Sequence, residues 1–279
     1  MSGFQMTRRN SLAAVAFAAA AAPAAIERYI RYQHAGRISW GRLEGEQITP
    51  LSNAPYLNGR PLGSKKALRE VKLLAPADPS KVFAVGLNYK SHIGNRTAPR
   101  EPEIFYKPTT CLVASGEPIV IPAGAKNVHY EGELVLVLAK GGRNLNLAQA
   151  SAAIFGATCG NDVSERDWQN GKDKDLQWWR AKGSDSFGPL GPMLVRGSDY
   201  QKALLQTRLN GEVVQKQLTS DLLFDCPTIV SFISKYVTLE AGDVIFTGTP
   251  GATRKMSPGD TVEVEIDGIG RLRNPVQGA

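Results

Sequence analysis

A mainly β fold with a few helices, of the α+β class, is what this chain of 279 residues predicts. Short runs rich in Val, Ile and aromatic residues recur along the sequence, with Gly, Pro and Asn between them. Only residues 144–156 and 227–236 carry apolar residues at clear helical spacing. Asn210-Gly211, which lies between two strand-like runs, is a marker of a two-residue hairpin turn. Because strands do not alternate with long helices, we do not expect a doubly wound α/β sheet.

The first 24 residues have the order of regions found in an export signal. Paired arginines at positions 8 and 9 precede an alanine-rich run over residues 13–22, and a small-x-small pattern ends at Ala24. The arginines resemble a twin-arginine signal, although a disordered or weakly helical tail is the simpler alternative. The run is too short and too weakly apolar to span a membrane, so we expect no stable membrane anchor after signal cleavage. We therefore expect a periplasmic protein, or a cytoplasmic one if the signal is not functional.

The charge and the cysteines exclude some classes of protein. The net charge of +7 is spread along the chain and no nucleic-acid motif accompanies it, so nucleic acid is not an expected partner. Cys111, Cys159 and Cys226 fit no CxxC zinc pattern. We expect three buried, reduced cysteines, the alternative being one oxidised pair and one free thiol.

Residues 25–75 read as a small N-terminal β domain without catalytic motifs. Its strand candidates are residues 28–33, 38–43 and 46–51. A linker-like stretch with prolines at positions 76 and 79 follows, and residues 76–279 form the larger domain.

The larger domain is predicted to hold most of the strands and both clear helices. Its strand candidates are residues 82–87, 104–107, 111–115, 118–122, 130–139, 243–247, 261–266 and 270–276. The strand over residues 261–266 alternates apolar and polar residues, which predicts one solvated face. Asn144 is expected to cap the first helix, and Asp225 or Cys226 precedes the second, with Pro227 in its first turn.

Two glutamates at the head of the most apolar strand predict a metal site. Glu131 and Glu133 are two residues apart, so they share one face of the strand, directly before the apolar residues 134–138. The simpler reading is a solvent-facing pair, but two like charges beside a core are costly unless a cation lies between them. Asp162 offers a third oxygen ligand. All-carboxylate ligation suits a hard cation, Mg²⁺ or Mn²⁺, with Ca²⁺ as an alternative.

Three further positions could carry chemistry. Lys182 near a metal could stabilise a developing enolate, and His92 could be a general base. Thr249, at the end of the strand over residues 243–247, could help to hold a carboxylate. The simpler readings are a surface lysine, a structural histidine and an ordinary turn.

Taken together, the motifs resemble the fumarylacetoacetate hydrolase family, in order from about residue 76 to residue 276. The conjunction of the pieces is specific, although each one is modest. The matching pieces are residues 86–89 with His92, 105–107, 130–134, 161–169, Lys182 with Asp185, 188–192, 210–212 with Gln215, 242–250 and 268–270.

The resemblance implies a mixed β-roll, usually dimeric, with one divalent cation held by Glu131, Glu133 and Asp162. It implies that His92 activates water and that Lys182 steadies an enolate leaving group. The positions it implies around a keto or diketo acid substrate are Tyr89, Lys107, Arg166, Gln169 and Thr249. We expect a hydrolase that cleaves a carbon–carbon bond in a β-diketo acid. The alternatives are a lyase or isomerase of related oxo acids, and a non-catalytic periplasmic dicarboxylate binder.

Two departures from the family pattern concern the loops around this site. Many short members carry a Glu three residues after the histidine, where this chain has Asn95. Glu101 or Glu103 on the same loop could take its place. The turn over residues 251–255 lacks the usual Gly-Val-Gly. This departure weakens the inference from the family to a particular substrate and to hydrolysis.

Overall fold

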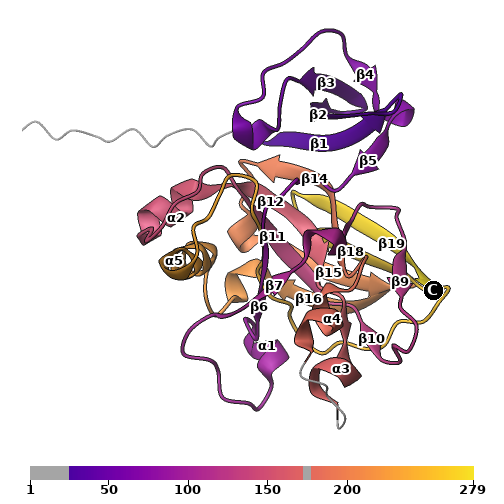
Figure 1. The fold of residues 1–279 in the computed structure, drawn as a ribbon, viewed down its shortest axis with the longest axis vertical. Coiled ribbons are helices and arrows are strands. Elements are labelled where there is room, and N and C mark those ends of the chain that lie inside the picture. The colour runs from indigo at the N-terminus through magenta and orange to yellow at the C-terminus, as the bar shows by residue number, and fades with distance from the viewer. Residues whose placement is uncertain (1–24, 172–176) are drawn as a thin grey trace, which may run out of the picture.

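Three β-sheets and five short α-helices make up the part of the chain that the computed structural model describes, residues 25–171 and 177–279. The largest sheet contains parallel and antiparallel neighbours, and helices cover only parts of it (Figure 1). The expected mainly β, α+β class with mixed sheets is therefore confirmed.

The N-terminal segment forms one end of the largest sheet (Figure 1). Its strands are β1 (Glu27–His34), β2 (Arg37–Glu44), β3 (Gln47–Leu51), β4 (Lys66–Ala67) and β5 (Lys72–Leu74). Because β1 also pairs with β14 (Gly188–Arg196), hydrogen bonding continues from this segment into the rest of the molecule. The expected export signal over residues 1–24 lies outside the described residues. Within the described ranges, no helix has the length and apolar character needed to cross a membrane.

The largest sheet continues from β14 through strands that are almost fully buried, except for the edge strand β7. They are, in order across the sheet, β12 (Ile154–Asn161), β11 (Gly132–Leu138), β17 (Val244–Phe246), β6 (Val82–Gly86) and β7 (Glu103–Lys107). All seven residues of β11 are buried, and the apolar run over residues 134–138 predicts this for most of the strand. A short strand, β8 (Leu112–Val113), pairs in parallel with β14.

A second sheet packs against the first. Its order is β16 (Glu212–Leu218), β15 (Leu204–Leu209), β18 (Thr261–Ile266), β19 (Gly270–Gly278) and β9 (Ile119–Ile121). Leu134 and Leu136 of β11 lie in one buried cluster with Leu205 of β15 and Val264 of β18, so the core runs between the two sheets. Buried and half-buried residues alternate along β18, as expected. The third sheet is the pair β10 (Val128–His129) and β13 (Ser164–Glu165).

The hairpin between β15 and β16 confirms the predicted turn. Asn210 and Gly211 connect the two strands and both have positive φ, 54° and 85°. This backbone is unfavourable for most residues but is tolerated by Asn and favoured by Gly.

Of the two helices that the sequence predicts, one is confirmed and the other begins later than expected. In α5 (Cys226–Tyr236), the Asp225 side chain caps the helix by accepting from the N–H of Thr228 at 2.9 Å. In α2 (Leu147–Ala153), the cap is Asn146 and not Asn144, because Asn146 and Gln149 form a reciprocal capping box. The helix also ends early, and Ile154 already belongs to β12.

Three further helices gather at one end of the molecule (Figure 1). They are α1 (Lys90–Ile93), α3 (Arg166–Asn170) and α4 (Trp178–Gly183). The sequence does not predict them, because four to six residues are too few for an apolar period to be visible. The remaining turns of 3₁₀-helix are Pro55–Leu57, Leu68–Glu70, Thr109–Cys111, Tyr200–Lys202 and Thr219–Asp221.

The three cysteines are free and buried, as expected. Burial raises the pKa of the Cys159 thiol to about 12 and that of Cys111 to about 11. Both therefore stay protonated and behave as small apolar side chains.

Candidate active site

Three carboxylates lie together at one end of the paired strands β11 and β12. Glu131 directly precedes β11, Glu133 is its second residue, and Asp162 directly follows β12. These antiparallel strands pair Gly132 with Asn161, and the N–H of Asp162 donates to the carbonyl oxygen of Glu131 at 2.9 Å. One oxygen from each side chain lies within 4.8 Å of the others, and all three residues are buried. The structure thus brings together the three carboxylates that the sequence analysis singled out.

Two of the three carboxylates are paired with cationic side chains. Lys182 Nζ donates to Glu131 Oε2 at 2.6 Å and to Asp162 Oδ2 at 2.7 Å. Lys107 Nζ donates to the other oxygen of Asp162 at 2.6 Å, and Arg166 pairs with the other oxygen of Glu131. Burial alone would raise the pKa of Glu131, but Arg166 and Lys182 outweigh it and lower the pKa. Burial would lower the pKa of Lys182, but Asp162 and Glu131 outweigh it and raise the pKa, so Lys182 is an ammonium at neutral pH.

Glu133 is in a different situation from the other two carboxylates. It is 1% exposed, it accepts a hydrogen bond from the N–H of Gly248 at 2.7 Å, and it forms no ion pair within residues 25–171 and 177–279. Burial raises its pKa well above the ordinary 4.5, and the charges of Asp162 and Glu131 raise it further. A buried carboxylate beside two others, without a cation of its own, is the arrangement that a bound cation would relieve.

The donor set fits a hard divalent cation. Glu131, Glu133 and Asp162 offer only carboxylate oxygens, which Mg²⁺, Mn²⁺ and Ca²⁺ prefer over the nitrogen and sulfur ligands typical of Zn²⁺. These three residues would hold the ion. The buried acidic cluster therefore supports the expected class of cofactor.

His92 stands beside the cluster with one ring nitrogen fixed by the backbone. Its Nδ1 lies 2.6 Å from the carbonyl oxygen of Gly251. Since a carbonyl only accepts, Nδ1 carries the hydrogen and Nε2 is left with a lone pair in the neutral ring. Nε2 lies 3.8 Å from Glu131 Oε1. Burial lowers the pKa of His92, so the ring is neutral near pH 7.

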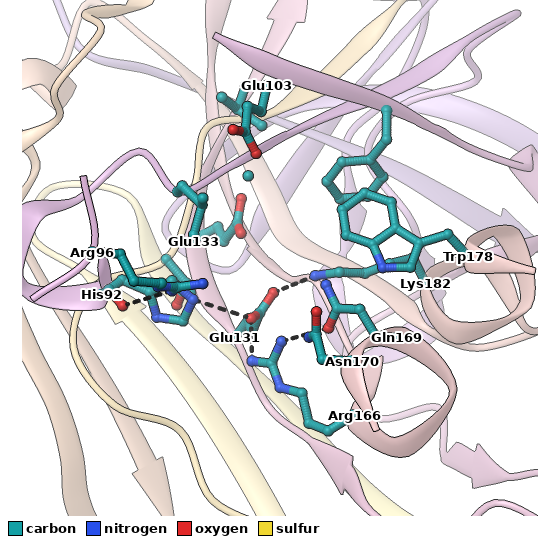
Figure 2. A pocket seen from close by; sticks show the side chains of 15 residues that line it. His92, Arg96, Glu103, Glu131, Glu133, Arg166, Gln169, Asn170, Trp178 and Lys182 are labelled. Carbon is teal, nitrogen blue, oxygen red and sulfur yellow. Dashed lines mark hydrogen bonds and ion pairs between the residues drawn. The ribbon is translucent and has the colours of Figure 1, made fainter. Parts of the chain in front are cut away.

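One cavity of ≈170 Å³ joins these groups (Figure 2). Figure 2 shows Glu131 between His92 and Lys182, with Arg166 pointing at the same carboxylate. The expected site residues that line the cavity are His92, Glu131, Glu133, Arg166, Gln169, Lys182 and Thr249.

Two of the expected substrate contacts lie outside the cavity lining. The side chain of Lys107 is fully buried, and its Nζ donates to Asp162 and to the backbone carbonyl of Lys182, so it braces the cluster from behind. Tyr89 is also fully buried, and its hydroxyl has no hydrogen-bond partner within the described residues. Lys107 therefore supports the carboxylate cluster and does not face the space that a substrate would occupy.

The cavity also has walls to which the sequence analysis gave no role in binding substrate. They come from Arg96, Glu103, Phe105, Asn170 and Trp178. The rings of Phe105 and Trp178 meet at a centroid distance of 5.0 Å, and Lys182 Nζ lies 5.2 Å from the centre of the Phe105 ring. Phe105 lies within a motif given above and Asn170 directly follows another, which are usable signals. Arg96 and Trp178 carry no such signal, because only the fold brings them here.

Asn95 does not take the role of the missing glutamate. It is exposed, and the carboxylate near His92 is Glu131. Glu101 is exposed, and Glu103 lines the cavity without an ion pair to His92. The expectation that Glu101 or Glu103 replaces the missing partner is therefore wrong, since the imidazole is oriented by a backbone carbonyl.

Comparison with known proteins gives a consistent result. The family model described as fumarylacetoacetate (FAA) hydrolase C-terminal matches residues 81–277, and one described as Rv2993c-like, N-terminal, matches residues 27–76. The chain is 42% identical to Protein Rv2993c of Mycobacterium tuberculosis, over 86% of this chain and 94% of that protein. It is 40% identical to oxaloacetate tautomerase fahd2, mitochondrial, of Xenopus laevis, over 74% of this chain and 68% of that protein. A crystal structure of 5-carboxymethyl-2-hydroxymuconate delta-isomerase from Mycobacterium smegmatis matches with a TM-score of 0.85 and 41% identity, covering 90% of this chain and all of that one.

These relatives overturn the expected periplasmic location. The Xenopus relative is a mitochondrial protein by its name, and the other two relatives named above are mycobacterial proteins. The expectation rested only on residues 1–24, and it is wrong by these comparisons.

Proposed function

This chain belongs to the fumarylacetoacetate hydrolase family, and we propose that it is a divalent-metal-dependent isomerase of a 2-oxo acid. The reaction would move a proton between a carbon atom and the enol oxygen, as in keto–enol tautomerisation or the shift of a conjugated double bond. One observation carries the proposal: His92 and Lys182 approach the same Glu131 carboxylate from two sides of one cavity, with pKa values shifted in opposite directions. Such a pair has the properties of a base and an acid at the same pH.

His92 is suited to the role of base. Gly251 fixes the hydrogen on Nδ1, which leaves the Nε2 lone pair on the side of the cavity. Burial keeps the ring neutral near pH 7, so the lone pair is available without prior loss of a proton. In the proposed reaction Nε2 would take the proton from the carbon next to the oxo group.

Lys182 is suited to stabilise charge on oxygen. Its ammonium stays protonated beside Asp162 and Glu131, and it lines the cavity. A positioned ammonium of this kind stabilises negative charge as it develops on the enolate oxygen, and His92 would then return its proton to that oxygen. A divalent cation held by Glu131, Glu133 and Asp162 would polarise the oxo group and make the neighbouring C–H more acidic.

The charges around the cavity favour an anionic substrate. In net charge the three carboxylates are matched by three cations among the described residues, Lys107, Lys182 and Arg166, although none of these pairs with Glu133. A divalent cation would therefore leave the site with a surplus of positive charge, which a 2-oxo acid anion would neutralise. The names of the relatives, an oxaloacetate tautomerase and a hydroxymuconate isomerase, support oxo and hydroxy-diene acids as substrates to test.

Hydrolysis of a β-diketo acid remains the second candidate. The same base could activate water, but the protonated imidazole would then have to persist until the leaving group is protonated. Glu131 lies 3.8 Å from Nε2, but the partner of Nδ1 is a carbonyl, which stabilises imidazolium less than a second carboxylate would, and Asn95 does not supply one. This is why the isomerase reading is preferred over the hydrolase reading.

The test is product identity. With Mg²⁺ or Mn²⁺, purified protein is offered the enol form of oxaloacetate, a hydroxymuconate-type diene acid and an acylpyruvate. Ultraviolet absorbance follows the enol and the diene, and a coupled assay follows released pyruvate. We expect metal-dependent loss of the enol or diene signal without pyruvate release. Faster pyruvate release from the acylpyruvate would support the hydrolase reading.

A matched pair of variants links the activity to the cluster. Glu133→Gln changes a carboxylate of the cluster, whereas Glu101→Gln changes an exposed carboxylate that makes no contact with the site. We expect E133Q to lose activity and E101Q to keep it. Activity that survives both EDTA and E133Q would rule out the proposed function.

A further inference from the structure

A chain of hydrogen bonds leads from the cavity residue Arg166 to residues that line no part of the cavity. Arg166 Nη2 donates to Thr253 Oγ1 at 2.9 Å, and the same hydroxyl lies 2.9 Å from His129 Nδ1. His129 Nε2 lies 2.8 Å from Asn127 Oδ1. The amide nitrogen of Asn127 donates to Asp167 at 2.8 Å, so the chain returns to the residue next to Arg166.

The direction of each bond in this chain follows from the chemistry of its ends. Because the Asp167 carboxylate only accepts, the amide of Asn127 must present its nitrogen there and its oxygen to His129. His129 Nε2 therefore carries the hydrogen, and Nδ1 of the neutral ring accepts. Thr253 must then donate its hydroxyl hydrogen to His129, which turns an oxygen lone pair toward Arg166. Each group donates to the next, from Arg166 to Asp167.

This chain of hydrogen bonds fixes the orientation of the Arg166 guanidinium. Both hydrogens of Nη2 are taken, by Glu131 and by Thr253, and one hydrogen of Nη1 is taken by Gln169. A guanidinium has five N–H donors, so two remain without a partner within the described residues. Arg166 lines the cavity, so a ligand there would not have to displace a protein partner from these two donors.

Arg166 needs such support because its helix is small. The helix α3 has only five residues, and its first backbone N–H donates to the carbonyl oxygen of Asn127 at 2.9 Å. Asn127 thus holds both the backbone of Arg166 and, through His129 and Thr253, its side chain. A donor held in place before the ligand arrives loses less entropy on binding.

We propose that Thr253 and His129 are positioning residues that orient Arg166 toward a carboxylate of the substrate. The proposal rests on the proposed function in taking the ligand to be an anionic oxo acid. Thr253 belongs to the turn in which this protein departs from the usual Gly-Val-Gly. The support of Arg166 by Thr253 therefore depends on a feature of this particular sequence.

The test compares Thr253→Val with Thr253→Ser in the metal-loaded full chain. Valine keeps the shape of threonine without the hydroxyl, and serine keeps the hydroxyl. Thr253 acts on the ligand only through Arg166, so we expect part of the effect of losing one hydrogen bond to a charged group: a KM about 5- to 20-fold higher in T253V, with kcat within about twofold of the wild type. T253S should restore most of the wild-type KM. Equal KM values in T253V and the wild type, or T253S behaving like T253V, would overturn the proposal.

Two further measurements separate positioning from a general structural effect. In an Arg166→Lys background, T253V should change KM no further, because Thr253 acts through the guanidinium. His129→Phe, which keeps a ring but removes both nitrogens, should raise KM in the same direction as T253V. Additive effects of T253V and R166K would contradict the proposal.

Calorimetry with oxalate keeps the test independent of turnover. If the wild type turns over no oxo acid, the proposed isomerase function fails, but oxalate binding in the presence of Mg²⁺ still reports the orientation of Arg166. We expect oxalate to bind T253V about 5- to 20-fold more weakly than T253S. Equal affinity in the two variants would overturn the positioning role even where activity is normal.

Discussion

Replacing Glu133 with Gln should stabilise the metal-free protein while it abolishes metal binding. Glu133 is 1% exposed and forms no ion pair with the described residues, and burial together with Asp162 and Glu131 raises its pKa well above 4.5. Glutamine keeps an oxygen for the N–H of Gly248 and replaces a like charge with an amide that can donate to a neighbouring carboxylate.

The pH sets an upper limit to this gain. A carboxyl group whose pKa is raised in the folded state avoids the cost of a buried charge by keeping its proton. Keeping the proton costs about 1.4 kcal/mol of folding free energy for each pH unit above the pKa of the unfolded state. Near pH 7, about 2.5 units above the ordinary value of 4.5, the penalty in the wild type is at most about 3.4 kcal/mol. Near pH 5 the limit falls below about 1 kcal/mol. The wild type therefore loses stability relative to E133Q as the pH rises from about 4.5.

The assay is chemical denaturation in EDTA near pH 5 and pH 7, repeated with saturating Mg²⁺. In EDTA near pH 7 we expect E133Q to be about 1 to 3 kcal/mol more stable than the wild type, and the difference to shrink at the lower pH. With Mg²⁺ the order should reverse, because ligand at about 1,000 times its Kd adds about 4.1 kcal/mol to a protein that binds it, which exceeds the expected advantage of E133Q. Glu101→Gln is the control and should follow the wild type throughout. Should E133Q be the less stable protein in EDTA near pH 7, or should its advantage not shrink with falling pH, the argument for an uncompensated buried carboxylate fails.

Three further predictions concern the residues around Glu133. Lys182→Met should lower the free energy of unfolding in EDTA by about 2 to 4 kcal/mol, because it leaves Glu131 and Asp162 buried without their shared cation; urea denaturation measures this. His92→Asn should reduce kcat by about 10²- to 10⁴-fold through loss of the base, with Mg²⁺ affinity unchanged in calorimetry; a large loss of Mg²⁺ affinity would show that His92 acts on the metal site instead. Burial, and then Arg166, lowers the pKa of His129 from 6.5 to about 4, so its neutral form is favoured in the folded state and stability is lost as the pH falls from about 6.5 toward 4. From about pH 7 to pH 5 the wild type should lose about 1 to 2 kcal/mol more than His129→Phe, and parallel pH profiles of the two proteins would contradict this.

The parts of the fold that could be predicted are those in which one local pattern decides the outcome. A local sequence pattern is enough to predict the apolar run of β11, the alternation along β18 and the Asn210-Gly211 turn. The start of α2 was misplaced because Asn144 and Asn146 are both acceptable caps, and only Gln149, three residues after Asn146, distinguishes them. The helices α1, α3 and α4 are held by tertiary contacts, which no short sequence window contains.

The same distinction applies to the site. Spacing predicts that Glu131 and Glu133 share one face, and residue type makes Asp162, His92 and Lys182 candidates. The family resemblance adds a role for each of them, and all five meet at the cluster. Sequence could not show which cations face the cavity and which stand behind it, because this depends on the depth of each side chain in the fold. The homodimer, which the resemblance implies, stays a prediction.

The two departures from the family pattern, at Asn95 and at residues 251–255, belong to one arrangement. The carbonyl of Gly251 orients His92, the N–H of Gly251 donates to Ser91 in the same helix α1, and Thr253 holds Arg166. One short turn therefore orients both the proposed base and the proposed anion-binding group. A carbonyl partner fixes the tautomer of His92 but stabilises its protonated form less than a carboxylate would. Such a base returns its proton readily, which suits the reversible transfer of one proton between carbon and oxygen better than a hydrolytic sequence that must store it.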